Sequence, residues 1–279
     1  AVKEAPRGVI VRLGGARCLR SGLTAWPIAV PLSRMSAPTR VVLKISGESF
    51  AAPSGFGIDS ERLSVIANEI AKAAAKVDLA VVVGGGNIVR GGTLAQQGQI
   101  AQATADYMGM LGTVLNGLAL REALEQMGHP SRLMSALAIP SVAEPFIRNR
   151  AIRHFEKGRI LVLAAGTGNP FFTTDTCASL RAAELGADRL LKATKVDGIY
   201  DRDPAKYSDA VRYDTLSFED AIEQQLGVMD LTALTMCMER KIPVQVFDFF
   251  TSGNIARAVS GEKIGTLVSP RHPNPAHSD

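Results

Sequence analysis

Cysteine and histidine are scarce in this chain. Its three cysteines, Cys18, Cys177 and Cys237, lie far apart and form no C-x-x-C pair, and its four histidines show no zinc-like spacing. An odd number of widely separated cysteines indicates free thiols in a reducing compartment. Zinc sites need closely spaced Cys and His ligands. The sequence therefore predicts neither disulfide bridges nor a resident metal ion.

Aromatic residues and long apolar runs are also few. Aromatic residues make up 5% of the 279 residues, and no apolar run approaches the roughly 20 residues that a membrane helix requires. The chain is long enough to bury a full core, as one large α/β domain or as two lobes. We expect a soluble, cytoplasmic α/β enzyme that has no membrane partner.

Basic charge is concentrated at the N-terminus and missing from the rest of the chain. Residues 1–34 hold six basic residues against the single acid Glu4, a local charge of +5, whereas the whole chain carries +4. The remaining residues therefore sum to −1. A nearly neutral body gives no reason to expect a nucleic-acid surface.

The basic N-terminal segment shows no helical or strand periodicity, and two interpretations of it stay open. It is Arg-rich and poor in acids, as a plastid transit peptide would be. Alternatively it precedes the true start of the protein, because Met35 lies just before the first predicted strand, and we favour this interpretation. In either case we predict a disordered or processed extension over residues 1–38, one folded domain over 39–270 and a C-terminal tail over 271–279.

Strand-like apolar runs alternate with helical periodicity throughout the body of the chain. The mostly apolar run at 40–46 is typical of a strand in a parallel sheet, and Asp59 can cap the helix that follows it. We expect further strands over 79–83, 132–138, 160–165, 188–192, 244–247 and 266–268, and helices over 100–127, 149–156, 174–185, 218–226, 230–240 and 255–259. The alternation predicts an α/β fold whose parallel or mostly parallel sheet is covered on both faces.

The long helix predicted over 100–127 is apolar on more than one face. Its apolar residues include Met108, Leu111, Leu115 and Leu118, which do not form a single stripe. Such a helix is either buried on several sides or shared with a second subunit. We favour the shared helix.

Three Gly-containing turns follow predicted strands: KISG at 44–47, GGGN at 84–87 and TGNPFFTTD at 167–175. The third opens a helix, and a helix N-terminus with free N–H groups favours an anion. Glycine lets N–H groups approach phosphate oxygens, and Arg90 adds a positive charge. A triple glycine alone is more often a tight turn, and neither the dinucleotide fingerprint nor the P-loop pattern is present. Together the three turns predict a site for more than one phosphate.

Lys44 is the most informative single residue. A lysine inside an apolar strand is costly unless its ammonium group meets an anion. The alternative is a solvated lysine at the sheet edge. Its position at the carboxyl end of a strand, where α/β proteins bind ligands, favours a functional role.

Simpler explanations remain open for other polar and aromatic residues. Thr174 or Asp175 can cap its helix, and Asp106 taken alone is a first-turn acid that suits the helix dipole. The pair Phe171-Phe172 suits packing as well as ligand contact. The stretch 192–204 fits a nucleoside site or a solvated loop with an Asp-Pro turn equally well.

Taken in order, these segments resemble the bacterial-type uridylate kinases of the amino-acid kinase family. The similarity spans about residues 40–268 and rests on the motifs VLKISGE (42–48), GFGID (55–59), VVVGGGNIVRG (81–91), ADYMGMLGTVLNGLAL (105–120), AAGTGNPFFTTDT (164–176), LKATKVDGIYDRDP (191–204) and GVMDLTA (227–233). GTGNPFFTTD combined with KATKVDG separates uridylate kinases from relatives that phosphorylate amino acids.

The resemblance implies a fold and a reaction. The fold is a three-layer αβα sandwich with a mostly parallel central sheet, in which ATP and UMP face each other across the carboxyl ends of the central strands. The reaction is transfer of the ATP γ-phosphoryl group to UMP, in pyrimidine nucleotide biosynthesis. The resemblance also implies Mg²⁺ with ATP, a homohexamer, activation by GTP and inhibition by UTP.

The resemblance further implies roles for individual residues. The catalytic set is Lys44, Arg90, Asp175 and Lys192, with Asp175 orienting the lysines. The ATP side comprises Lys44, Ile45, Ser46, Gly47, Gly86, Arg90, Thr194, Tyr200 and Asp203. The UMP side comprises Gly85, Asp106, Thr167, Gly168, Asn169, Pro170, Phe171, Phe172, Thr173 and Thr174.

The sequence departs from the family pattern in two places, and two other functions stay open. The N-terminal extension has no family counterpart, and the loop at 52–57 keeps GFG but differs just before it, which weakens the implied effector response. The alternatives are a relative that phosphorylates a carboxylate, such as that of aspartate or acetylglutamate, and a non-catalytic nucleotide-binding protein. The TGNPFFTTD loop argues against the first, and the presence of Lys44 and Asp175 argues against the second.

Overall fold

The computed structural model describes residues 38–271, apart from 53–54, 76, 91–95, 97, 99 and 228. Cys18, residues 1–37 of the predicted extension and residues 272–279 of the predicted tail lie outside the described residues. No helix in the described part of the chain is both long enough and apolar enough to cross a bilayer.

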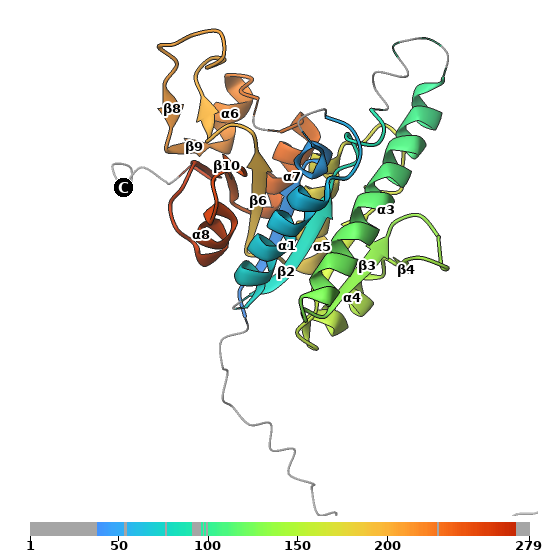
Figure 1. Cartoon of the computed structure of the whole chain (residues 1–279). Helices are drawn as coiled ribbons and strands as arrows, with labels where there is room; N and C mark the ends of the chain where they lie inside the picture. Colours follow the sequence, from blue (N-terminus) through green and yellow to red (C-terminus); the bar gives the residue numbers. More distant parts are fainter. Residues whose placement is uncertain are drawn as a thin grey trace, which may run out of the picture. The chain divides into compact units, whose positions relative to one another are not determined.

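A nine-stranded sheet forms the centre of the fold (Figure 1). The strand order is β4-β3-β5-β2-β1-β6-β10-β11-β9. The strands are β1 (Arg40–Ile45), β2 (Asp78–Val83), β3 (Ser131–Ser135), β4 (Glu144–Pro145), β5 (Ile160–Ala164), β6 (Arg189–Thr194), β9 (Thr215–Ser217), β10 (Val244–Asp248) and β11 (Thr266–Ser269). All neighbours are parallel except β10 and β11. The predicted mostly parallel sheet is therefore confirmed.

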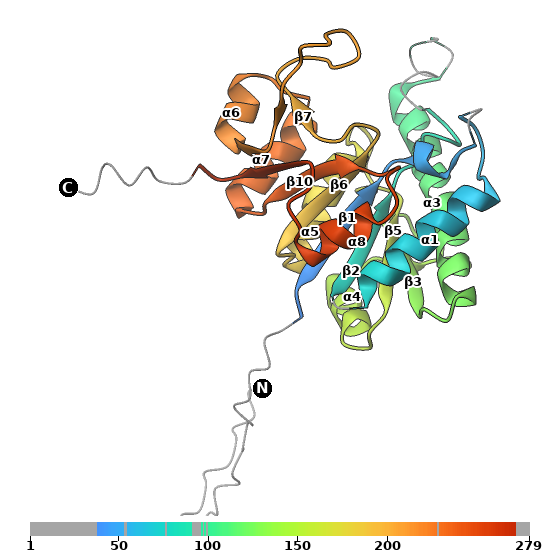
Figure 2. The same cartoon turned by 60° about the vertical axis from the view of Figure 1, so that its left-hand side comes forward.

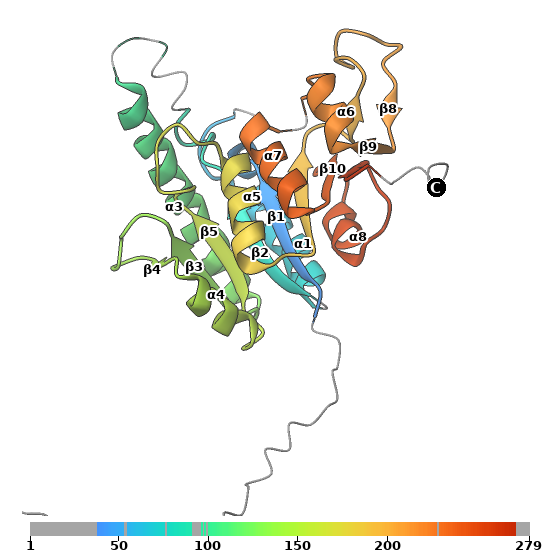
Figure 3. The same cartoon turned by 180° about the vertical axis from the view of Figure 1, so that it is seen from behind.

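Helices cover both faces of this sheet, because successive strand residues point to opposite sides. Val41, Leu43 and Ile45 of β1 pack with α1 (Ser60–Ala74), α3 (Gln102–Gln126) and α8 (Asn254–Ser260), which Figure 2 shows on one face. Val42 packs on the opposite face, in the same cluster as residues of α4 (Arg148–Phe155), α5 (Thr174–Leu185), α6 (Phe218–Glu223) and α7 (Leu231–Arg240), of which α5 and α7 are in front in Figure 3. The result is the three-layer αβα arrangement that the resemblance implies.

The element boundaries follow local chemistry. Asp59 caps α1 as predicted, since its carboxylate accepts a hydrogen bond from the Arg62 N–H at 2.9 Å. The strand predicted over 132–138 ends at Ser135, whose hydroxyl accepts from the Leu137 N–H and so turns the chain. The helix predicted over 218–226 ends at Glu223, because Gln225 has a left-handed backbone with φ of 51°.

The shortest elements were not predicted from the sequence. These are the 3-10 turn η1 (Gly47–Phe50), the strands β4 and β9, and the two-stranded sheet of β7 (Ile199–Tyr200) and β8 (Arg212–Tyr213). Strands of two or three residues are too short for an alternating pattern to develop. The free thiols predicted for Cys177 and Cys237 are confirmed, and burial raises the pKa of each to about 11.

Candidate functional site

Two lysines leave neighbouring strands of the sheet on the same face. Lys44 of β1 is the direct register partner of Lys192 of β6 in the parallel ladder. Both therefore point toward the layer that contains α5, as Val42 does. Because β1 and β6 are parallel, this pairing brings both ammonium groups to the carboxyl ends of the strands, where α/β folds bind ligands.

Asp175, in the first turn of α5, joins the two lysines. Its Oδ1 lies 2.9 Å from Lys44 Nζ, and its Oδ2 lies 2.7 Å from Lys192 Nζ. The three side chains are 11% (Lys44), 15% (Lys192) and 14% (Asp175) exposed, so all three charges are largely withdrawn from water. The interpretation of Lys44 as a solvated edge residue is wrong. The three side chains together carry two positive charges and one negative charge, a balance that suits an incoming anion.

Burial and charge shift the pKa values within this cluster in different ways. Burial alone would raise the pKa of Asp175, but the charges and hydrogen bonds of Lys44 and Lys192 outweigh it and hold the pKa below 3.8. For Lys192 burial is the largest effect, and it exceeds the attraction of Asp175, so the pKa of Lys192 lies below 10.5. Asp175 is therefore ionised at neutral pH. Lys192 loses its proton more easily than an ordinary lysine does.

The glycine turns after β1 and β2 pack against each other and against α3. A Cβ at Gly47 would lie 2.4 Å from the Gly86 N, and one at Gly85 would lie 2.5 Å from the Gly109 O of α3. These contacts leave no room for a side chain. Gly86 differs, because nothing lies within 4 Å of its Cβ direction. The Gly84–Gly86 turn is thus anchored on one side and open on the other.

Two buried amides lock this turn, and sequence reasoning missed them. Asn87 and Asn116 donate to each other's amide oxygens at 3.0 and 2.7 Å, and Asn116 Nδ2 also donates to the Gly84 O at 2.7 Å. An asparagine in the middle of an apolar helix needs partners when it is buried, which is the signal that could have revealed the pair.

The contrast between Gly85 and Gly86 gives a prediction for stability. We expect Gly85→Ala to lower the free energy of unfolding by about 1–3 kcal/mol, because the added methyl group overpacks the contact with α3. The matched variant Gly86→Ala stays within about 0.5 kcal/mol of the parent protein. Urea unfolding of the three proteins measures this difference. Equal stability of the two variants would contradict the described packing of the turn.

Arg90 does not join the lysine cluster through any described contact; it forms an ion pair with Glu48 of η1. Lys195 pairs with the other oxygen of the same carboxylate. The hydrogen bond from Lys195 is the largest cause that lowers the pKa of Glu48, and Arg90 adds to it. Both basic side chains are more than half exposed. Glu48 and Lys195 are therefore polar neighbours of the site that the sequence did not single out.

The loop after β5, which leads into α5, is tied to α3. Phe171 has a left-handed backbone with φ of 71°, and its N–H donates to Asp106 Oδ2 at 2.8 Å. Asp106 lies beyond the first turn of α3, so the interpretation as a first-turn acid is wrong. Phe171 and Phe172 are 74% and 51% exposed, which excludes core packing for both rings within this chain.

The cap of α5 is Thr173, rather than Thr174 or Asp175. The Thr173 hydroxyl accepts from the Asp175 N–H at 3.0 Å and from the Thr176 N–H at 3.2 Å. Thr174 and Asp175 are the first two residues of the helix itself. This shift frees the Asp175 carboxylate from capping, so both of its oxygens face the lysines.

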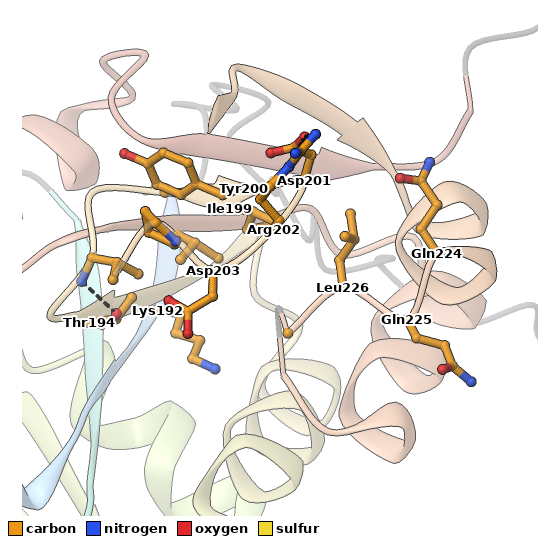
Figure 4. A pocket seen from close by; sticks show the side chains of 15 residues that line it. Lys192, Thr194, Ile199, Tyr200, Asp201, Arg202, Asp203, Gln224, Gln225 and Leu226 are labelled. Carbon is orange, nitrogen blue, oxygen red and sulfur yellow. Dashed lines mark hydrogen bonds and ion pairs between the residues drawn. The ribbon is translucent and has the colours of Figure 1, made fainter. Parts of the chain in front are cut away.

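A cavity of about 440 Å³ lies beside Lys192, and the residues predicted for the adenosine side line it (Figure 4). Thr194, Tyr200 and Asp203 line it on the side of Lys192, and Gln224–Leu226 line it across from them. The segment 224–227 was not predicted as part of a site. The structure therefore brings one end of this cavity to the lysine cluster, because Lys192 lines it.

Comparison with known proteins finds matches along most of the chain. The model of the amino acid kinase family matches residues 39–248. A UMP kinase structure from Bacillus anthracis is 37% identical, with a TM-score of 0.81, and the match covers 85% of this chain and 98% of that one. A UMP kinase from Ureaplasma parvum is 36% identical with a TM-score of 0.79, and covers 83% and 99%. A uridylate kinase from Archaeoglobus fulgidus is 30% identical with a TM-score of 0.65, and covers 83% and 100%.

Proposed function

Because the chain belongs to the amino acid kinase family, we propose that it is a UMP kinase, which transfers the γ-phosphoryl group of ATP to UMP and yields UDP and ADP. The observation that carries this proposal is the buried Lys44–Asp175–Lys192 cluster, which lies between the cavity at 194–204 and the loop at 167–174. Relatives that are 36–37% identical along more than four-fifths of the chain support UMP as the acceptor.

The ATP side of the proposed site lies over β1, β2 and β6. The adenosine occupies the cavity at Thr194, Tyr200 and Asp203, and the phosphates extend across the turn of Ile45, Ser46, Gly47 and Gly86 toward Lys44. Arg90 reaches the phosphates once they displace its contact with Glu48. The open space at Gly86 supports this path, because a phosphate can approach its backbone closely.

The UMP side lies over β5 and the start of α5. The loop from Thr167 through Gly168, Asn169, Pro170, Phe171, Phe172 and Thr173 to Thr174 holds the UMP phosphate at the α5 N-terminus, where the helix dipole favours negative charge. Gly85 and Asp106 complete this side. Asp106 already fixes the loop through the Phe171 N–H, which supports a role in shaping the ribose subsite.

The reaction needs positive charge and alignment more than it needs a base. An oxygen of the UMP phosphate attacks the γ-phosphorus of ATP in line, a new P–O bond forms, and the bond to the ADP oxygen breaks. The acceptor oxygen is already an anion, so no proton has to be removed from it. Lys44 and Lys192 stabilise the charge on the transferred group, and Asp175 holds both ammonium groups in place.

Mg²⁺ enters as part of the MgATP substrate. Within the described residues no group of three or more His, Cys, Asp or Glu side chains lies close enough to hold a metal ion. Both oxygens of Asp175 already contact lysine ammonium groups. This set of donors suits an ion that is carried by phosphate oxygens and water, as Mg²⁺ in kinases commonly is.

A substrate panel tests the proposed function against its two alternatives. The protein is incubated with MgATP and, separately, UMP, CMP, aspartate or acetylglutamate, and ADP release is followed. We expect UMP to give the fastest release. Preferential turnover of a carboxylate substrate would support the amino-acid-phosphorylating alternative. No turnover with any acceptor would support the non-catalytic one.

The rate of this reaction should fall at alkaline pH, because Lys192 stabilises the transferred group only while it is protonated. Asp175, Lys44 and Asp230 are among the charged groups that act on Lys192, and the net effect of burial and these charges lowers its pKa from the ordinary lysine value. Raising the pH through that lowered pKa removes the proton, so kcat falls at a lower pH than the titration of an ordinary lysine would give. A plot of kcat against pH shows this fall as an alkaline limb. In Lys192→Arg the guanidinium stays charged at every pH at which the protein is assayed, so the limb should move to higher pH, and an unchanged limb would contradict the assignment.

The proposal extends to assembly, regulation and location. Tyr107, Leu111 and Leu115 form an exposed stripe at four-residue spacing along α3, at 42%, 50% and 49% exposure. This stripe supports a helix shared between copies, within a homohexamer. GTP as activator, UTP as inhibitor and the cytoplasm as location complete the proposal. The folded domain over 39–270 is supported by β11, which ends at Ser269.

A further inference from the structure

Asp230 stands at the N-terminus of α7 and binds two helices at once. Its Oδ1 accepts from the Ala233 N–H at 2.9 Å, which caps α7. Its Oδ2 accepts from the Thr173 hydroxyl at 2.5 Å, and both oxygens lie 3.0 Å from the Thr176 hydroxyl of α5. Capping α7 needs only one of these contacts, so the other hydrogen bonds require another explanation.

The bond from Thr173 to Asp230 fixes the direction of the Thr173 hydroxyl. A hydroxyl has one proton and two lone pairs. Because the hydroxyl proton is donated to Asp230, the lone pairs of Thr173 Oγ1 are free to accept hydrogen bonds. Oγ1 accepts one from the Asp175 N–H at 3.0 Å and one from the Thr176 N–H at 3.2 Å. Without the carboxylate, the hydroxyl can rotate and donate elsewhere. The cap of α5 then weakens at the residue that carries the catalytic carboxylate.

Asp230 also lies close in sequence to the wall of the nucleotide cavity. Residues 224–227 line that cavity and lead into α7 three residues before Asp230. Asp230 is thus linked to both sides of the proposed site. The backbone connects it to the wall of the ATP cavity, and its hydrogen bond with Thr173 connects it to the UMP loop. It adds a negative charge near Lys192 as well, which opposes the lowering of the pKa of that lysine.

We propose that Asp230 is a positioning residue that holds the α5 N-terminus, and with it Asp175 and the acceptor loop, in register with the wall of the nucleotide cavity. It acts through Thr173 and Thr176 and touches no reacting atom. This inference rests on the proposed function, because the register of the two sides affects the rate only if a group passes between them.

The variant Asp230→Asn tests this role, with Asp59→Asn as its matched control. Asparagine caps helices as well as aspartate does, so both variants keep a capped helix. Asp59 caps α1 through the Arg62 N–H. We expect Asp230→Asn to lower kcat about tenfold to a hundredfold, as a small misplacement of reacting groups does, and Asp59→Asn to leave kcat near the parent value.

A second readout separates positioning from a loss of folded protein. Removing the charge of Asp230 lowers the pKa of Lys192 further, so the alkaline limb of kcat moves to lower pH in Asp230→Asn and stays in place in Asp59→Asn. If Asp230→Asn does not fold, Thr176→Val takes its place, because it removes one hydroxyl contact and keeps the charge. We expect Thr176→Val to lower kcat by a smaller factor, with the limb in place.

The outcomes are distinguishable from a failure of the proposed function. If the parent protein turns over UMP and Asp230→Asn matches Asp59→Asn in kcat and in its alkaline limb, the positioning role is wrong. If Asp230→Asn does not fold and Thr176→Val is used in its place, an unchanged kcat in Thr176→Val also shows that the positioning role is wrong. If the parent protein does not turn over UMP at all, the proposed function itself has failed.

Discussion

Replacing Lys44 with alanine should lower kcat by at least a factor on the order of 10²–10³ and leave the protein folded. The loss of one group that stabilises transition-state charge in a dry site typically costs that much. The fold should survive because Asp175 keeps Lys192 as its partner at 2.7 Å. Measurement of kcat by coupled ADP release, with circular dichroism on the same samples, tests both parts.

A surface lysine provides the control for this prediction. Lys72 on α1 is 65% exposed, and it loses the same side chain and charge in Lys72→Ala without affecting the cluster. Its kcat should remain near the parent value. A folded Lys44→Ala protein with a rate like that of Lys72→Ala would remove Lys44 from the reaction.

Asp175→Asn should damage both catalysis and stability. The variant leaves two largely buried ammonium groups beside each other without their counter-charge, and breaking a buried pair in this way costs roughly 3–5 kcal/mol. We expect the free energy of unfolding at pH 7 to fall by roughly that amount. The kcat should fall at least as far as in Lys44→Ala, because both lysines lose the group that orients them.

The pH dependence of this stability loss follows from the lowered pKa of Asp175. An ionised Asp175 contributes stability fully above its unfolded pKa near 3.8, and the contribution is lost as the pH falls through the lower folded value. The gap between parent and variant should therefore be wide at pH 7 and narrow below pH 3.8. Urea unfolding across this range measures it. A gap that is constant with pH would show that the charge of Asp175 is not the cause.

The long elements of the fold could be predicted from the sequence because their patterns are long enough to read. β1 and α3 match their predicted ranges within two residues, and Asp59 caps α1 as expected. The strands of two or three residues could not be predicted, since their pairing depends on distant partners. β9, for example, pairs with β11, which lies about 50 residues later in the chain.

The sequence indicated which residues could belong to the site, but it did not show which of them contact one another. Lys44 was suspected because a charge inside an apolar strand needs an anion, yet only the register of β1 against β6 shows that Lys192 stands beside it. The cap of α5 was assigned to Thr174 or Asp175, and three consecutive residues that can all cap a helix make such an error easy. Asp230 was missed because its role arises from a contact with Thr173, more than 50 residues earlier in the chain. The 224–227 wall was missed because it lines a cavity together with residues 192–204, from which it is separated in the sequence.

Transfer of a labelled phosphoryl group tests the central claim most directly. The protein is incubated with Mg²⁺, UMP and ATP that carries ³²P in its γ-phosphate, and the products are separated by chromatography. The account predicts that the label appears in UDP, in an amount equal to the ADP formed, and that Lys44→Ala yields little of it. Label found only in inorganic phosphate, or remaining in ATP while the protein is folded, would contradict the assignment of UMP as the acceptor.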